Sequence, residues 1–298
     1  MTAPRQILPG TTYLVTRRCS ERRFFLRPSD KTNAVFGYIL AIAATRYDVR
    51  VHAFCVLSNH FHLVVTDPHA RLPEFHRYLD ALVARAINCS LGRWESFWDP
   101  DSYSAVRLES DAAVMEKMVY VLANPVAAGL VRHGREWPGL WSDPDRIGGA
   151  PITIERPKGF FREEGPMPAS ATLQLHRPAG FETDQSFVDA LSRALREAEG
   201  RVAAEHEHER RCFLGPRRVL AQNPNARPAP GEPRRSVSPR VACRNKWKRI
   251  EALLRLAEFG CAYRDALAAW RAGVRDAVFP AGTWQMRVQH AVCCTAPG

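Results

Sequence analysis

Residues 53–66 read Ala-Phe-Cys-Val-Leu-Ser-Asn-His-Phe-His-Leu-Val-Val-Thr, and their second half has the pattern of a buried strand that ends at the turn signal Asp67-Pro68. Side chains two apart on a strand share a face. We therefore expect His60 and His62 to project together while Phe61 packs on the other side. Two neutral imidazoles side by side form a half-site for a divalent metal. The alternative is two histidines that belong to the core or the surface.

A second stretch, residues 110–125, has apolar residues at helical spacing and opens with Ser110-Asp111, a good N-cap pair. Tyr120 and Asn124 are four residues apart, so they should lie one turn apart on one helix face. Pro125 disfavours the α conformation at the residue before it, which predicts that the helix ends at Asn124. This face would offer a phenol and an amide oxygen. The alternative is a packed tyrosine with asparagine as a cap.

The two stretches together resemble a known family. His60-Phe61-His62 on a strand, followed by Tyr120-Val-Leu-Ala-Asn-Pro125, is similar to the single-tyrosine HUH transposases. Among these, the chain resembles the REP-associated tyrosine transposases, relatives of the insertion-sequence-200 type. The similarity runs from about Gly10 to about Ser142, and the paired motifs are specific in this order and spacing. Two positions depart from the family pattern: Ser58 replaces a frequent proline, and Ala127 replaces a frequent arginine.

The resemblance implies a mechanism. Tyr120 would attack a DNA phosphate and form a 5′-phosphotyrosine, and the reverse attack would join a new strand without ATP. His60, His62 and Asn124 would hold Mg²⁺ or Mn²⁺, which binds the phosphate and withdraws charge. The substrate would be single-stranded or hairpin DNA. Related transposases include monomers and dimers, so a homodimer is possible.

Two other functions are compatible with the same residues. The first is a regulator that binds hairpin DNA or RNA on this fold without cleaving it. The second is a metal-dependent hydrolase that uses water, with Tyr120 only structural. The intact set of Tyr120, His60, His62 and Asn124 argues against lost catalysis.

The composition points to a polyanionic partner. The chain has 298 residues, of which 46% are hydrophobic, and a formal net charge of +11. Nucleic acid is the simplest such partner. A membrane partner is not expected, because no apolar run approaches the ~20 residues of a spanning helix. The eight cysteines form no C-x-x-C pair and are read as reduced thiols, so we expect a cytoplasmic, nucleoid-associated protein.

The order of predicted elements gives the fold class. Strand, helix, strand, strand, helix and strand follow one another before the tyrosine helix, at 11–17, 30–47, 50–57, 60–66, 72–91 and 103–108. This order fits a split β-α-β arrangement. We therefore predict an α+β, ferredoxin-like antiparallel sheet with packed helices, followed by a mainly helical, basic C-terminal region.

Basic and aromatic residues near this sheet are candidate DNA contacts. Four arginines follow the first strand closely and form either a phosphate-binding edge or a solvated hairpin: Arg17, Arg18, Arg22 and Arg23. Trp98 follows the second helix. Aromatic residues there can stack on unpaired bases, but such residues more often close a core.

The second half of the chain is expected to be a separate region, with 1–148 as the transposase-like domain and 149–298 as the basic remainder. A helix is predicted at 186–209, whose Glu205-His-Glu-His-Glu209 end is read as solvated surface. Residues 210–250 hold twelve Lys or Arg against one acid, and about 215–243 should be flexible. There, Arg234 and Arg235 are expected to contact DNA phosphates; the alternative is a plain linker. From Asn245 two further helices are predicted, separated at Phe259-Gly260.

Overall fold

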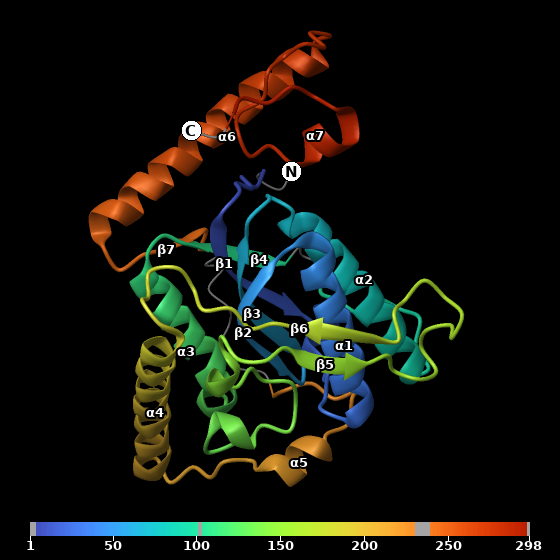
Figure 1. Cartoon of the computed structure of the whole chain (residues 1–298), viewed down its shortest axis with the longest axis vertical. Coiled ribbons are helices and arrows are strands. Elements are labelled where there is room, and N and C mark those ends of the chain that lie inside the picture. Colours follow the sequence, from blue (N-terminus) through green and yellow to red (C-terminus); the bar gives the residue numbers. More distant parts are fainter. Residues whose placement is uncertain (1–3, 101–102, 230–238, 297–298) are drawn as a thin grey trace.

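The computed structural model describes residues 4–100, 103–229 and 239–296. Within these ranges, five strands form one sheet in the order β2-β3-β1-β4-β7 (Figure 1). Each neighbouring pair among the first four is antiparallel; these strands are β1 (Thr11–Arg18), β2 (Arg50–Leu57), β3 (His60–Asp67) and β4 (Ser104–Leu108). Helices α1 (Asp30–Tyr47) and α2 (Leu72–Ser90) connect them. This is the predicted split β-α-β order, so the predicted α+β fold is confirmed.

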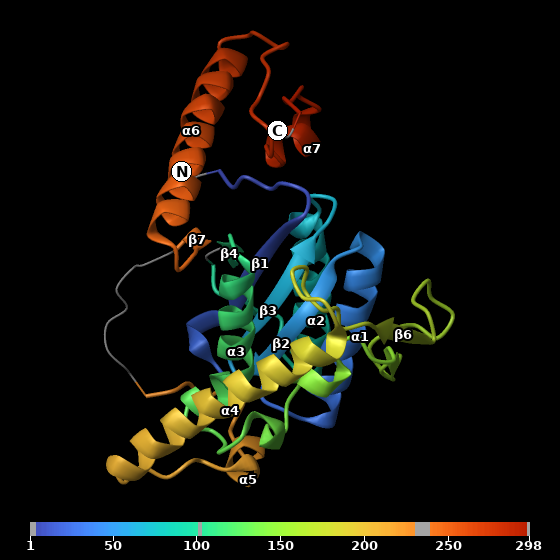
Figure 2. The same cartoon turned by 60° about the vertical axis from the view of Figure 1, so that its left-hand side comes forward.

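The two faces of the sheet are covered by different helices. Phe61 is fully buried and packs on Phe36 of α1, with ring centroids 5.2 Å apart, and on His76 of α2. Burying a phenylalanine contributes about 2 kcal/mol. The third helix, α3 (Asp111–Ala127), lies on the opposite face (Figures 1 and 2). There, the ring of Tyr120 contacts the ring of His62. The alternation of β3 therefore sends its two histidines toward α3, as its sequence predicts.

Helix α3 corrects one expectation. It does not end at Asn124 but continues through Pro125 to Ala127, and the Ala128 N–H still donates to the Asn124 carbonyl at 2.9 Å. A proline this close to a C-terminus removes only one intrahelical hydrogen bond. The residues around it are buried, among them Leu122 and Val126. This packing outweighs the local preference, and Asn124 therefore lies inside the last turn.

Elements beyond residue 148 pack on this unit. The hairpin of β5 (Ile152–Glu155) and β6 (Ser170–Leu173) lies against α1. Helix α4 (Asp184–His208) packs on α3, as Figure 2 shows, and buries Phe187 and Leu191 in the same core as the sheet. One expectation for α4 was wrong. His206 is not solvated but buried, because its ring stacks on Phe213 with centroids 4.3 Å apart.

The segment 215–243, expected to be flexible, begins and ends in regular structure. Its start forms α5 (Pro216–Leu220), and its end forms β7 (Val241–Ala242), which pairs in parallel with β4. Residues 230–238, with Arg234 and Arg235, lie outside the described residues. The domain boundary near 148 stays a prediction.

The C-terminal part is mainly helical. Helix α6 (Lys246–Arg271) is continuous, so the predicted break at Phe259-Gly260 was wrong. Phe259 is buried, and a helical glycine costs only about 1 kcal/mol relative to alanine. Helix α7 (Gln285–His290) follows, and a small second core contains Phe279 and Met286. Short 3-10 helices complete the described elements: η1 (Ser20–Arg22), η2 (Gly134–Glu136) and η3 (Pro144–Arg146).

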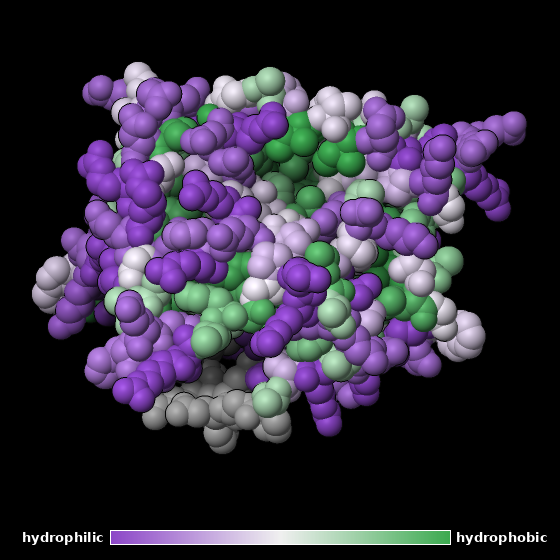
Figure 3. Space-filling model, turned by 90° about the horizontal axis from the view of Figure 1, so that it is seen from below, coloured by the Kyte–Doolittle hydropathy of each residue, from purple (hydrophilic) through white to green (hydrophobic). Residues whose placement is uncertain are grey.

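The described surface is largely hydrophilic where Figure 3 shows it, from below α4 and α5, with apolar areas that are small and separated. Across the described ranges, no helix combines the length and the apolar character that crossing a bilayer requires.

His52 gives the fold a testable dependence on pH. Its ring is buried in β2, donates from Nδ1 to the His176 carbonyl at 2.7 Å, and accepts at Nε2 from the Thr66 hydroxyl at 2.7 Å. Burial lowers the pKa of His52 to about 4, below the ~6.5 of an unfolded chain. Because the unfolded state takes up the proton first, this contribution to stability is complete above about pH 6.5 and is lost as pH falls toward 4.

We therefore expect the free energy of unfolding in urea to decrease over that range in wild type, and to decrease less in His52→Gln. The exposed His69, which pairs with Asp48 on the surface, supplies the control variant His69→Gln. An equal pH dependence for wild type and His52→Gln would contradict the assignment of a neutral buried ring.

Candidate functional site

Two imidazoles form the centre of the site. His60 and His62 stand two residues apart at the start of β3, and their ring centroids are 4.8 Å apart at an interplanar angle of 89°. His60 is half-buried, whereas His62 is only 3% exposed. Their shared face follows from the strand period of two. The two rings that the sequence predicts to project together are thus neighbours on one face of β3.

The ring of His62 is oriented by β1. In the β1–β3 register Thr16 lies opposite His62, and its Oγ1 is 2.7 Å from His62 Nδ1. The other ring nitrogen, Nε2, is buried and has no hydrogen-bond partner among the residues that the structure describes. Leaving a buried polar atom unpaired costs about 1–3 kcal/mol. An orphaned imidazole nitrogen next to a second imidazole fits a metal ion as its missing partner.

The ring of His60 is oriented by the residue before it. The Asn59 amide donates from Nδ2 to the Arg22 carbonyl at 3.2 Å, which turns its Oδ1 toward His60 Nδ1 at 2.6 Å. Because this oxygen can only accept, His60 carries its proton on Nδ1. The Nε2 atom of His60 therefore keeps a free lone pair. Both histidines are held through Nδ1, the arrangement in which outer hydrogen bonds fix ligand histidines.

Both rings are neutral at pH 7. Burial lowers the pKa of His60 to about 4. Burial, with a smaller contribution from the His60 ring, lowers the pKa of His62 well below its ordinary value. Neutral imidazole is the ligand form, so protons do not compete with a metal near pH 7.

Tyr120 lies next to this pair. Helix α3, capped by Ser110 through the Ala113 N–H, brings the Tyr120 ring to 5.3 Å from the ring of His62, at an interplanar angle of 75°. Tyr120 is 46% exposed, so a large substrate can reach its hydroxyl. Lys117, one turn earlier, places its Nζ 6.0 Å from the Tyr120 ring centroid. The site thus combines an accessible phenol, two neutral imidazoles and a nearby cation.

Asn124 lies one turn after Tyr120 on α3 and is 9% exposed. Its side chain makes no hydrogen bond with any residue that the structure describes, which is compatible with a free amide oxygen. No group of three His, Cys, Asp or Glu side chains gathers in the described part of the chain. A third protein ligand beside His60 and His62 would therefore be of another residue type, and Asn124 is a candidate.

The structure separates the basic residues expected at the site. Arg17 lies opposite Phe61 in the register and pairs with Asp80 of α2 at 3.6 Å, so it belongs to the other face of the sheet. Arg18 lies opposite His60 and shares its face. Arg22 contributes its carbonyl to Asn59, while Arg23 pairs with Glu21 at 2.9 Å.

Trp98 is part of the core. Its indole is 8% exposed, donates from Nε1 to the Asp80 carbonyl at 2.9 Å, and packs edge-on against Phe61 with centroids 5.6 Å apart. An indole this buried presents little ring surface to a base, which favours the core alternative for Trp98.

Thr16, Asn59 and Lys117 were missed by sequence reasoning. Asn59 directly precedes His60, and Lys117 stands three residues before Tyr120. Sequence spacing alone could therefore have predicted that Asn59 lies near His60 and Lys117 near Tyr120. The position of Thr16 could not be predicted in this way, because only the β1–β3 register places it opposite His62.

Thr16→Val removes the hydroxyl that orients His62 and keeps the shape of the side chain. We expect Mn²⁺ affinity to fall by about 10–100-fold, the usual cost of losing an outer-sphere partner. Thr12→Val is the matched control, because Thr12 stands on the same strand face and bonds Thr66 at 2.7 Å, away from His60 and His62. Calorimetric titration of both variants measures the effect, and equal affinities would contradict the orienting role.

No protein-family model matches the chain, and neither does any curated protein. Solved structures that are similar to parts of the chain include two transposases. One is described as a REP-associated tyrosine transposase bound to a REP hairpin; it is 17% identical over 47% of this chain and 81% of its own, with a TM-score of 0.40. The other, a Deinococcus radiodurans R1 protein described as a transposase, is 20% identical over 41% of this chain and 95% of its own, with a TM-score of 0.30. At these values, neither similarity assigns the chain to a family.

Proposed function

We propose that this chain is a metal-dependent single-strand DNA endonuclease and strand transferase that acts through Tyr120. One observation carries the proposal: an accessible tyrosine ring lies 5.3 Å from His62, a neutral histidine whose buried Nε2 has no partner among the described residues. A tyrosine with only a structural role would not need an unpaired histidine nitrogen beside it. A tyrosine that attacks a phosphate next to a metal ion would need such a nitrogen as a metal ligand.

Each residue of the site has a separate proposed role. His60 and His62 would hold Mg²⁺ or Mn²⁺ through Nε2, with the Asn124 amide oxygen as the proposed third ligand. When bound, the ion neutralises charge on the scissile phosphate. The Tyr120 oxygen forms a bond to phosphorus as the bond from phosphorus to the 3′ oxygen breaks. The phenol proton goes to solvent, and the departing oxygen gains a proton to become a 3′-hydroxyl. The 5′-phosphotyrosine keeps the bond energy, so attack by a 3′-hydroxyl rejoins DNA.

The substrate class follows from access and charge. The phosphate must approach both α3 and the face of β3, which a continuous duplex presents less readily than a single strand or the foot of a hairpin. The net charge of +11 favours a polyanion. We therefore propose single-stranded or hairpin DNA as substrate.

One experiment separates this function from the two alternatives. The full-length protein is incubated with Mn²⁺ and a pool of DNA hairpins whose loops and single-stranded flanks are randomised, then denatured. We expect a DNA–protein adduct that survives denaturation, together with a free 3′-hydroxyl strand. Binding without an adduct or cleavage would indicate a regulator, and cleavage to free products only would indicate a water-using hydrolase.

A further inference from the structure

A cavity of about 430 Å³ adjoins Tyr120 on the side of the C-terminal segment. We call it the β7 groove. Its apolar lining includes Leu14, Val106 and Ala242. Its rim carries the basic side chains of Lys117, Arg244 and Arg249. Tyr120 lines the same cavity, so the groove opens directly onto the proposed nucleophile.

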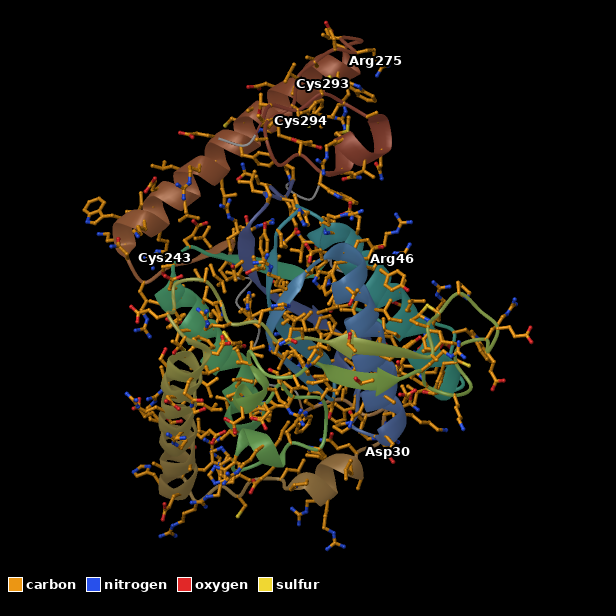
Figure 4. All side chains as sticks on the ribbon, in the orientation of Figure 1. Asp30, Arg46, Cys243, Arg275, Cys293 and Cys294 are labelled. Atoms are coloured by element: carbon orange, nitrogen blue, oxygen red, sulfur yellow. The ribbon has the colours of Figure 1, made fainter. Side chains whose placement is uncertain are left out.

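The C-terminal segment forms one wall of the groove. Strand β7 pairs in parallel with β4, with Ala242 opposite Leu108, and the Glu109 N–H donates to the Ala242 carbonyl at 3.2 Å. Figure 4 shows the labelled Cys243 where the chain passes from β7 to the start of α6, near the N-terminal half of α3. Cys243 itself lines the groove. The groove therefore depends on residues far outside the part of the chain that carries the histidines and the tyrosine.

The charges around the groove favour an anion. Lys117 and Arg244 both pair with Glu116, at 2.8 and 2.7 Å, and their hydrogen bonds lower the pKa of the Glu116 carboxyl. Arg249 forms no ion pair with any described carboxylate. Among the described residues that line the groove, three cations thus face one carboxylate, an excess of two positive charges. Lysine and arginine in such an arrangement bind phosphate, and arginine can do so with two parallel hydrogen bonds.

We propose that the β7 groove is a nucleotide subsite, which holds a deoxynucleotide flanking the scissile phosphate. Its base lies over Leu14, Val106 and Ala242, and its phosphate contacts Arg244, Arg249 and Lys117. A strand whose phosphate sits at the Tyr120 hydroxyl must continue past it, and the groove is a cavity that Tyr120 lines. Its volume lies within the range of about 300–1,000 Å³ typical of ligand sites. The assignment of the groove to the DNA strand being cut rests on the proposed function.

Two groove variants and one matched control test the proposal. Arg244→Gln/Arg249→Gln removes two charges from the rim, and Ala242→Trp fills the groove without changing charge. The control Lys246→Gln/Lys248→Gln removes two charges from the exposed first turn of α6, where neither lysine lines the groove. All three are made in the Tyr120→Phe background, so that binding is measured without cleavage. The probe is the hairpin most enriched from the randomised pool by binding to Tyr120→Phe itself.

Hairpin affinity is measured at several salt concentrations. We expect the slope of log affinity against log salt to fall by about 1.4 for Arg244→Gln/Arg249→Gln, which is about 0.7 for each of two single-strand phosphate contacts. Ala242→Trp should weaken binding with a smaller change of slope, and the lysine control should keep the slope of its parent. If both groove variants have the same salt slope and the same affinity as the control, the subsite proposal is wrong.

Shortened probes identify which strand occupies the groove. One shortened probe lacks the single-stranded flank on the 5′ side of the stem, and the other lacks the flank on the 3′ side. With one of these two probes, the parent and the groove variants should bind with equal affinity. A difference that survives both removals would also overturn the subsite. Adduct formation by the otherwise wild-type protein is scored separately. If the adduct forms but the groove variants bind the hairpin like their parent, only the subsite is refuted. If the groove variants change hairpin binding but no adduct forms, the proposed function is refuted.

Discussion

Tyr120→Phe is expected to abolish the covalent DNA adduct and to lower cleavage by at least about 10³-fold, as loss of a nucleophile does in other enzymes. Hairpin binding should change by no more than about twofold, because the ring keeps its edge-on contact with His62 and only the hydroxyl is lost. Adduct formation on denaturing gels and hairpin binding are measured on the same preparations.

Tyr47→Phe is the matched control for this substitution. Tyr47 is a partly buried tyrosine on α1, packed edge-on against Tyr78 on the other side of the molecule from His62. The Tyr47→Phe variant should cleave DNA at the wild-type rate. Cleavage by Tyr120→Phe at a rate close to wild type would exclude Tyr120 as the nucleophile.

His62→Ala and His60→Ala are expected to remove metal-dependent cleavage and to weaken Mn²⁺ binding by more than about 100-fold, beyond the cost of losing an outer-sphere partner. Each substitution deletes one of two neutral imidazoles whose ring centroids are 4.8 Å apart. His62→Ala also removes the buried Nε2 atom, whose lack of a hydrogen-bond partner is unfavourable. The variant should therefore lose the metal site but keep the fold.

Calorimetric titration with Mn²⁺ measures this effect, with one site expected in wild type. His69→Ala is the control, because His69 is exposed and pairs with Asp48 at 2.7 Å, away from the site. Equal Mn²⁺ affinity in wild type, His60→Ala and His62→Ala would refute the histidine pair as ligands.

The sheet and the centre of the site were predictable because they depend on local spacing. The alternation of His60, Phe61 and His62 fixes which side chains share a face, and four residues between Tyr120 and Asn124 fix one helical turn. Local propensity was less reliable where packing opposed it. Buried neighbours carry α3 through Pro125, and α6 runs uninterrupted through Gly260.

Contacts between distant segments were not predictable. Strand β7 is two residues long and follows a basic, proline-rich segment, so nothing in its own sequence indicates that it joins the sheet beside β4. The same is true of Arg17, whose side of the sheet depends on the register with Phe61. Net charge predicted a polyanionic partner but could not place the β7 groove, which exists only where α3, β4 and the start of α6 meet.

Mass spectrometry of the adduct tests the central claim most directly. The protein is incubated with Mn²⁺ and the hairpin pool, digested with protease and nuclease, and searched for peptides that carry a residual nucleotide. We predict that the nucleotide is attached through its 5′ phosphate to the oxygen of Tyr120. Attachment to another residue, or cleaved DNA with every Tyr120 peptide unmodified, would contradict the account.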